Sequence, residues 1–127
     1  MRDLIVSVVA VALLIGAWLL FFNYSQHQIN QFAGIIETSA IPLAGEADWD
    51  GCNTQISILN RKWHKYKSIA FFFLDTDSLN QIDYSMARSV QYIKAQDYSN
   101  ASGELLALSE QLKRLYSNER ITFANIL

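Results

Sequence analysis

The chain has 127 residues, of which 51% are hydrophobic and 17% are charged, and its formal net charge is -2. This balance excludes a disordered or strongly polyionic chain and gives no reason to expect a nucleic-acid partner, but it fits one small domain plus an apolar segment. The single Pro, the few Gly and the helical spacing of apolar residues predict an all-α fold. The single Cys excludes an internal disulfide.

The first predicted element is the apolar run from Leu4 to Phe22, which contains no charged residue. At ~1.5 Å per residue, a helix over this run spans roughly 28 Å, close to the hydrocarbon thickness of a bilayer. A cleaved signal peptide would have a shorter apolar region followed by small residues, whereas this run ends in Phe-Phe-Asn-Tyr. The sequence therefore predicts an uncleaved transmembrane anchor over residues 1-24 and a helical domain over residues 25-127.

Flanking charges predict the orientation of this anchor. Arg2 is the only cation near either end, because the next one along the chain is Arg61. Cations are favoured on the cytoplasmic side, so we expect a cytoplasmic N-terminus and an extracytoplasmic domain. Trp18 and Tyr24 suit the interfacial end of such a helix.

Four amphipathic stripes follow the anchor, with apolar residues three or four positions apart, as in helices that bury one face. The stripes are Ile29, Phe32, Ile36, Ala40 and Leu43; Cys52, Ile56, Leu59, Trp63, Tyr66, Ala70 and Phe73; Leu79, Ile82, Met86, Val90 and Ile93; and Ala101, Leu105, Leu108, Leu112 and Leu115. The first helix continues the anchor, and we expect Pro42 to end it. Four stripes with short links predict an antiparallel four-helix bundle of two helical hairpins.

The two predicted hairpins resemble each other. A shift of about 50 positions places the first stripe on the third and most of the second on the fourth. The elbows match as well, because Asp48 to Cys52 corresponds to Asp97 to Ala101. An internal duplication and a chance likeness between two amphipathic hairpins both explain this pattern.

Helix rise predicts where each segment lies relative to the membrane. The first bundle helix climbs roughly 27 Å above the anchor, and the second descends to membrane level near residues 67 to 70. The third climbs again and the fourth returns, so residues 71 to 74 and the C-terminal tail should meet beside the anchor. We expect this membrane-proximal collar to contact lipid or a partner protein. Its residues are Phe71, Phe72, Phe73, Leu74, Ile121, Phe123, Ile126 and Leu127.

The second helix also carries four cations near that level, Arg61, Lys62, Lys65 and Lys67. Basic residues interleaved with aromatics occur in nucleic-acid-binding surfaces, but Trp63 and Tyr66 lie on the buried stripe here. Two interpretations remain for the cations. They form a solvated face, or they are attracted to anionic headgroups just above the membrane, where each contributes ~1 kcal/mol.

Residues with catalytic or metal-binding chemistry do not converge in the sequence. His27 and His64 lie off the buried stripes, so both are expected to face solvent rather than form a metal site. Asp83, Glu104 and Glu110 lie beside the stripes, where solvated pairs with Lys94, Lys113 or Arg114 are expected. The sequence contains no nucleophile elbow, phosphate-binding glycine loop or His-Glu-x-x-His motif. We therefore predict no enzyme activity, no metal and no cofactor.

The stretch from Asp48 to Cys52 is the remaining candidate for a reactive site. Cys52 opens the second stripe and corresponds to Ala101, which predicts a small buried residue where two helices come close. Asp48 and Asp50 are expected to be helix N-terminal acids, favoured by capping and the helix dipole. Whether Cys52 pairs with another copy of the chain is left open.

Several short pieces of the sequence resemble one protein family. They are the Asp48-Trp49 elbow, Trp63, Ile82, Tyr92-Ile93, Asp97 and the terminal Asn125-Ile126-Leu127, together with the N-terminal span. These are similar to a family of short single-span proteins from Gram-positive bacteria that is labelled domain of unknown function DUF4363. The family often has Asp-His-x-Glu-Ile-Asp where the third helix starts, whereas Asp75 to Asn80 here lacks both His and Glu.

What the resemblance implies is an anchored, extracytoplasmic helical domain of the bacterial cell membrane with no established activity. It also implies that the gene often neighbours one for a multi-span membrane protein. Our leading hypothesis is therefore a non-enzymatic accessory subunit that docks on a multi-span membrane protein through the collar. A homo-oligomer is left open, and the collar residues would otherwise simply close the end of the bundle.

A second hypothesis is an extracytoplasmic sensor or ligand-binding bundle. It predicts a cavity lined by Trp63, Tyr66, Met86 and Tyr92. A hydrolase or metalloprotein is a third class, which would require polar groups that converge in a cleft.

Overall fold

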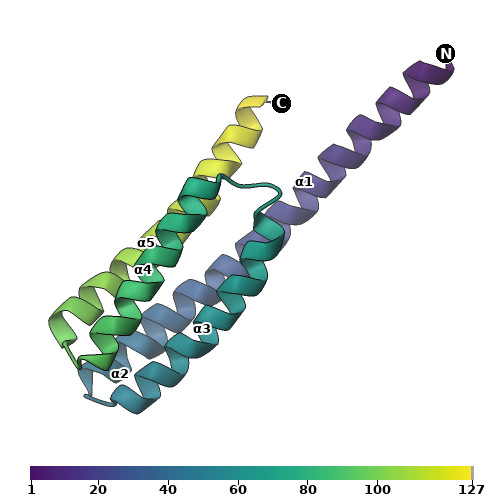
Figure 1. The fold of residues 1–127 in the computed structure, drawn as a ribbon. Helices are drawn as coiled ribbons and strands as arrows, with labels where there is room; N and C mark the ends of the chain where they lie inside the picture. The colour runs from purple at the N-terminus through teal and green to yellow at the C-terminus, as the bar shows by residue number, and fades with distance from the viewer. Residues whose placement is uncertain (127) are drawn as a thin grey trace.

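The computed structural model describes the backbone of residues 1–126 and their side chains except those of residues 116 and 118–126. The first helix is continuous from α1 (Arg2–Ile35) through a π-helical turn, η1 (Ile36–Ala40), into α2 (Ile41–Gly45), and is followed by α3 (Trp49–Ala70), α4 (Thr76–Lys94) and α5 (Tyr98–Ile126). The chain runs up and down so that α1 and α4 each pack against both α3 and α5 (Figure 1). The predicted all-α fold and four-helix bundle are confirmed.

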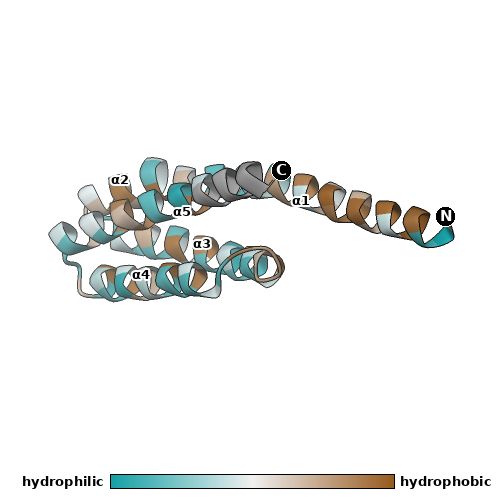
Figure 2. Ribbon diagram, turned by 90° about the horizontal axis from the view of Figure 1, so that it is seen from above, coloured by the Kyte–Doolittle hydropathy of each residue, from teal (hydrophilic) through white to brown (hydrophobic). Residues whose placement is uncertain are grey.

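The N-terminal half of α1 projects beyond the bundle (Figure 1). Its side chains are exposed throughout residues 2–14, and Figure 2 shows this part as the longest apolar stretch of the fold. In the described part of the chain, one helix, Arg2–Gly45, is long enough and apolar enough to cross a membrane. Soluble proteins seldom leave so large an apolar surface uncovered.

The first helix does not end at Pro42, so that prediction is wrong. Proline lacks the N–H that an α-helix needs, and its ring clashes with the carbonyl four residues earlier. The π-helical turn η1 widens the helix just before the proline: the N–H of Ile41 donates to the carbonyl of Ile36, five residues back. Pro42 then occupies the first turn of α2, where a missing N–H costs nothing, and the helix continues to Gly45.

The four predicted stripes form the core of the bundle. Their residues are buried, except that Leu43, Phe73 and Val90 are half-buried. Sequence reasoning missed Ser25, Ser85, Ser89 and Ser109, which are buried among them. Serine is small enough to let two helices approach, and three of these hydroxyls have partners: Ser25 with the Tyr66 hydroxyl, Ser85 with Glu104 and Ser109 with Glu37.

The two elbows are built alike. Ala47 and Gln96 both adopt the left-handed conformation, with φ of 59° and 55°. The next N–H, of Asp48 or Asp97, donates to the carbonyl of the residue five positions earlier, which closes a Schellman turn. The aspartate carboxylate then accepts a hydrogen bond from the N–H three residues on, at 3.0 Å in the first elbow and 3.2 Å in the second. This likeness agrees with the predicted repeat of the hairpins.

Gly51 is required by the first of these caps. A Cβ atom at this position would lie 2.7 Å from Oδ2 of Asp48, which is closer than atoms can approach. Glycine therefore leaves room for the Asp48 carboxylate over the first turn of α3, where its negative charge is favoured. The predicted role of Asp48 as a helix cap is confirmed.

Two of the predicted ion pairs have other partners than expected. Asp83 pairs with Lys67 across the α3–α4 interface and also accepts a hydrogen bond of 2.6 Å from the Trp63 indole N–H. Glu104 pairs with Arg88 at 3.0 Å. The sequence predicted pairs with Lys94, Lys113 or Arg114, whereas the antiparallel register of the bundle selects partners on adjacent helices. Only Glu110 contacts an expected partner, Lys113, at 4.0 Å.

We predict that Asp83→Ala lowers the free energy of unfolding by about 1–3 kcal/mol, because the fully buried Trp63 loses the acceptor of its N–H. Denaturant unfolding of the full chain in detergent micelles, followed by Trp fluorescence, measures this change. Glu110→Ala is the matched control, since its exposed carboxylate makes only a 4.0 Å ion pair, and it should change stability by less than about 0.5 kcal/mol. Equal effects of the two substitutions would contradict the prediction.

Candidate docking surfaces at one end of the bundle

The turn between α3 and α4 and the end of α5 lie at the end of the bundle from which α1 projects (Figure 1). Residues 71 to 74 and the tail were predicted to meet beside the first helix, and the backbone places both at the same end of the bundle. The side chains of Ile121, Phe123, Ile126 and Leu127 lie outside the described residues. The surface at this collar end is therefore described from Phe71 to Leu74, the neighbouring part of α1 and the last turns of α3.

Phe73 packs the turn between α3 and α4 against α1. Its ring stacks on Phe21 with centroids 4.4 Å apart and planes 11° apart, and Trp18 meets it edge-on at 5.4 Å. Leu74 is buried beside it. Leu74 therefore belongs to the interior rather than to a lipid or partner contact, which corrects the prediction for this residue.

Phe71 and Phe72 face outward instead. Their exposed fractions are 58% and 80%, and their rings contact each other edge to face at 5.9 Å. Two adjacent exposed phenylalanines at one end of a bundle do not stabilise the core. The structure thus separates the predicted collar into an inner pair, Phe73 and Leu74, and an outer pair, Phe71 and Phe72.

An apolar groove lies between α1 and the end of α3, with a volume of about 320 Å³. It is lined by Ala17, Leu20, Phe21, Tyr24, Ile69 and Phe73. Leu20 and Ile69 are exposed at 73% and 40%, so the groove opens to the outside along the apolar half of α1. Sequence reasoning missed this groove, because its two walls belong to helices that only the tertiary fold brings together.

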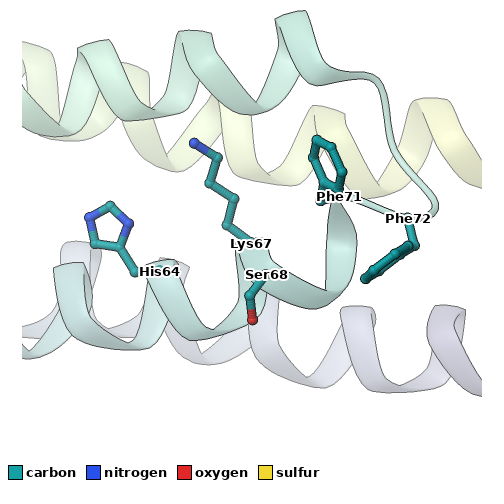
Figure 3. Close-up of a pocket in the computed structure, with 5 residues that line it drawn as sticks. All are labelled: His64, Lys67, Ser68, Phe71 and Phe72. Atoms are coloured by element: carbon teal, nitrogen blue, oxygen red, sulfur yellow. The ribbon is translucent and has the colours of Figure 1, made fainter.

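A second hollow, of about 330 Å³, lies on the opposite flank of α3. Its lining changes in character along the helix: His64, Lys67 and Ser68 lie at one end, and Phe71 and Phe72 at the other (Figure 3). His64, Lys67 and Ser68 recur at three- and four-residue spacing, so they share one face of α3, and Phe71 and Phe72 belong to the turn that follows it. The groove residue Ile69 lies on another face of α3, and Phe73 belongs to the same turn.

The four predicted headgroup-contacting cations differ in their surroundings. Arg61, Lys62 and Lys65 are exposed. Lys67 is half-buried and pairs with Asp83 on α4. An ammonium has three donors, so this ion pair leaves Lys67 able to donate further hydrogen bonds.

The residues expected to line a sensor cavity lie in the core, apart from Tyr92, which is half-buried. Trp63 and Tyr66 are fully buried and Met86 nearly so. The rings of Trp63 and Tyr66 lie 5.6 Å apart, and that of Phe32 lies 6.3 Å from the first and 5.7 Å from the second. The two hollows described above lie elsewhere.

The titratable groups with shifted pKa values are either buried in the bundle or paired with other side chains at its surface. Hydrogen bonds from Lys113 and Ser109 lower the pKa of Glu37, and Glu37 in turn raises the pKa of Lys113. Burial, and then the Asp48 carboxylate, raises the pKa of Cys52, whose thiol donates to the Ala40 carbonyl at 3.3 Å. The predicted burial of Cys52 is confirmed.

The two histidines are both exposed, as their positions off the stripes predict. Among the described residues, no three His, Cys, Asp or Glu side chains gather so that they could hold a metal ion. The features that stand out in this part of the chain are apolar and cationic surfaces.

The comparison with protein families identifies the family of this chain. The model of the family described as a domain of unknown function, DUF4363, matches residues 23–126. The chain belongs to this family. The resemblance predicted from the sequence is confirmed, and the DUF4363 match begins where the apolar run of α1 ends. No curated protein and no solved structure matches the chain.

Cys52 is predicted to be unreactive in the folded protein, because the thiol is buried and its raised pKa disfavours the thiolate. Alkylation of the full chain in micelles should be at least about tenfold slower than for the exposed cysteine of Cys52→Ala/Ser57→Cys. A non-reducing gel should show no disulfide-linked dimer of the wild type. Equal alkylation rates, or such a dimer, would contradict the prediction.

Glu37 is predicted to stabilise the fold above pH 4.5, its ordinary pKa, and to lose this contribution as the pH falls through its lower folded value. Glu37→Gln should therefore reduce the loss of unfolding free energy between neutral and acidic pH. Denaturant unfolding at a series of pH values measures the difference. Glu46→Gln removes an exposed carboxylate near the first elbow and serves as the control. An acid response identical in wild type and Glu37→Gln would refute this role.

Proposed function

We propose that the chain is a non-enzymatic, membrane-anchored helical domain that docks on a multi-span membrane protein. The single observation that carries this proposal is the groove between α1 and α3, which is continuous with the exposed apolar half of α1. In this proposal the N-terminal half of α1 crosses a bacterial cell membrane, and the bundle stands on the extracytoplasmic side, as Arg2 predicts.

The position of the groove along α1 defines the kind of partner. Ala17, Leu20 and Tyr24 belong to the last turns of the apolar run and the turn after it. When the run spans the bilayer, these residues lie at the outer edge of the hydrocarbon layer. An occupant of the groove must therefore present an apolar surface at the same depth, which is what a transmembrane helix of an integral protein does.

Small residues on this wall favour helix contact. Transmembrane helices associate where small side chains let backbones come close, and Ala17 is the smallest residue of the groove. Ile69 extends the contact above the membrane span, so a partner would meet both the anchor and the bundle. This arrangement supports a partner that is recognised by shape and depth rather than by an enzymatic reaction.

The sensor hypothesis has less support. The residues that would line its cavity include Trp63 and Tyr66, which pack against each other and hydrogen-bond to Asp83 and Ser25. A ligand at that position would have to displace buried rings that already have partners.

Ala17→Phe is predicted to block docking, because the larger ring fills the groove while α1 stays apolar. Affinity capture of the full chain from its own membranes in mild detergent, after cross-linking, should recover the multi-span partner with the wild type and at least about fivefold less with the variant. Ala12→Phe makes the same change on a face of α1 that is turned about 140° from Ala17 and does not line the groove, and it should leave recovery unchanged.

Two results would count against the proposal. The first is equal recovery of membrane proteins with wild type and Ala17→Phe when both remain in the membrane after alkaline extraction. The second is release of the wild type itself by alkaline extraction, which would remove the anchor on which the proposal depends.

A further inference from the structure

We propose that the hollow lined by His64, Lys67, Ser68, Phe71 and Phe72 is the seat of an acidic phospholipid. The acyl chain would lie against the two phenylalanines and the phosphate would face His64, Lys67 and Ser68. This inference rests on the membrane anchor of the proposed function and adds a second membrane contact, on the other flank of α3 from the docking groove.

One aromatic contact determines where the hollow lies relative to the membrane. Phe73 stacks on Phe21 and meets Trp18, so the turn that carries Phe71 and Phe72 lies beside the last turns of the apolar run. A spanning run places Phe21 near the edge of the hydrocarbon layer. The exposed rings of Phe71 and Phe72 then reach the acyl chains instead of water, which accounts for their exposure in the isolated chain.

The polar end of the hollow lies at headgroup height. His64 lies one turn of α3, roughly 6 Å of rise, beyond Ser68, and Phe71 and Phe72 follow on the membrane side in the turn after Ala70. The headgroup layer adds about 5 to 8 Å to each side of the hydrocarbon core. Lys67 and Ser68 therefore lie at the level of lipid phosphates, and His64 lies at the outer boundary of that layer.

The order of chemistry along this face matches the order within a phospholipid. Two apolar rings at the membrane side are followed by a hydroxyl, an ammonium and an imidazole, as Figure 3 shows. Lys67 and His64 carry N–H donors that suit a phosphate oxygen, whereas the Ser68 hydroxyl already donates to the Lys65 carbonyl. A partner protein would not require this gradient along the bilayer normal, whereas a lipid does.

Charge gives the preference for an acidic headgroup. Residues 61 to 68 contain four cations and no acid, and Arg61 and Lys65 extend the exposed line that passes through Ser68. Two acids on α4 and the turn before it already have partners. The Asp83 carboxylate is held by Lys67 and Trp63, and that of Asp75 accepts hydrogen bonds from the first turn of α4. The side of the hollow on α3 therefore remains electropositive.

Ser68→Glu tests the proposal, because it places a carboxylate beside the phosphate position without touching the core. Ser68 is exposed, and its hydroxyl bonds only to the Lys65 carbonyl within its own helix, at 2.7 Å. Ser57→Glu is the matched control: Ser57 is exposed on the same face of α3, three turns farther from the membrane. The two variants share the same net charge and the same helix.

The measurement is native mass spectrometry of the full chain purified from micelles that contain equal amounts of phosphatidylglycerol and phosphatidylcholine. Wild type and Ser57→Glu should retain phosphatidylglycerol in preference to phosphatidylcholine. Ser68→Glu should reduce the retained phosphatidylglycerol by about fivefold or more, since each nearby charge changes lipid attraction by roughly that factor. Phe72→Ser should reduce the retention of both lipids, because it removes the apolar end of the hollow.

Spin labelling of the same face provides a second readout. In the Cys52→Ala background, spin labels at positions 64, 68 and 72 of the full chain in vesicles of the same lipids should show falling access to a water-soluble nickel quencher and rising access to oxygen. Equal nickel access at all three positions would overturn the proposal. Protection from both quenchers at all three positions would also overturn it, because it would indicate that protein covers the hollow. Equal lipid retention by Ser68→Glu and Ser57→Glu would overturn it as well. None of these readouts requires the docking partner, so a failure here leaves the groove to be judged by its own experiment.

Discussion

The stacking of Phe73 on Phe21 is the contact on which the arrangement at the collar end depends. It joins the end of α3 to the last turns of the apolar run on α1, and Trp18 closes the contact from the other side. Because aromatic rings bury a large apolar area and pack in few geometries, this contact fixes the height of the α3–α4 turn on α1. The exposed positions of Phe71 and Phe72 and the shape of the groove beside Ile69 follow from it.

The rest of α3 is held in register by polar contacts of two buried aromatic side chains, Trp63 and Tyr66. The Trp63 indole donates to Asp83 on α4, and the Tyr66 hydroxyl pairs with Ser25 on α1. A buried donor without a partner is costly, so each contact favours one rotation of α3 over its alternatives. The consequence reaches the surface, because the same rotation turns His64 and Ser68 outward on one flank and Ile69 toward α1 on the other.

The end of α3 therefore carries two surfaces of different chemistry, one on each flank. The groove toward α1 is apolar over its whole length and fits an apolar helix at the same depth. The hollow on the opposite flank changes from phenylalanine to cation and hydroxyl over two turns, which fits a lipid. A domain held by both surfaces would be restrained in depth and in rotation relative to a membrane partner, whereas a single helical anchor restrains only its depth.

The sequence by itself determined the elements, the core stripes, the apolar run and the family. It did so because helical periodicity, capping aspartates and a long uncharged segment are local signals that survive without knowledge of contacts. It misjudged Pro42, because a π-helical turn just before the proline places it in the first turn of α2, and no local signal in the sequence marks that turn. It also missed the core serines, three of which find partners for their hydroxyls only on neighbouring helices. Only the tertiary structure decided that Leu74 faces inward while Phe72 faces outward, and that Lys67 pairs with Asp83. These outcomes depend on the register between helices, which is set by side chains far apart in the chain and therefore leaves no local pattern to read.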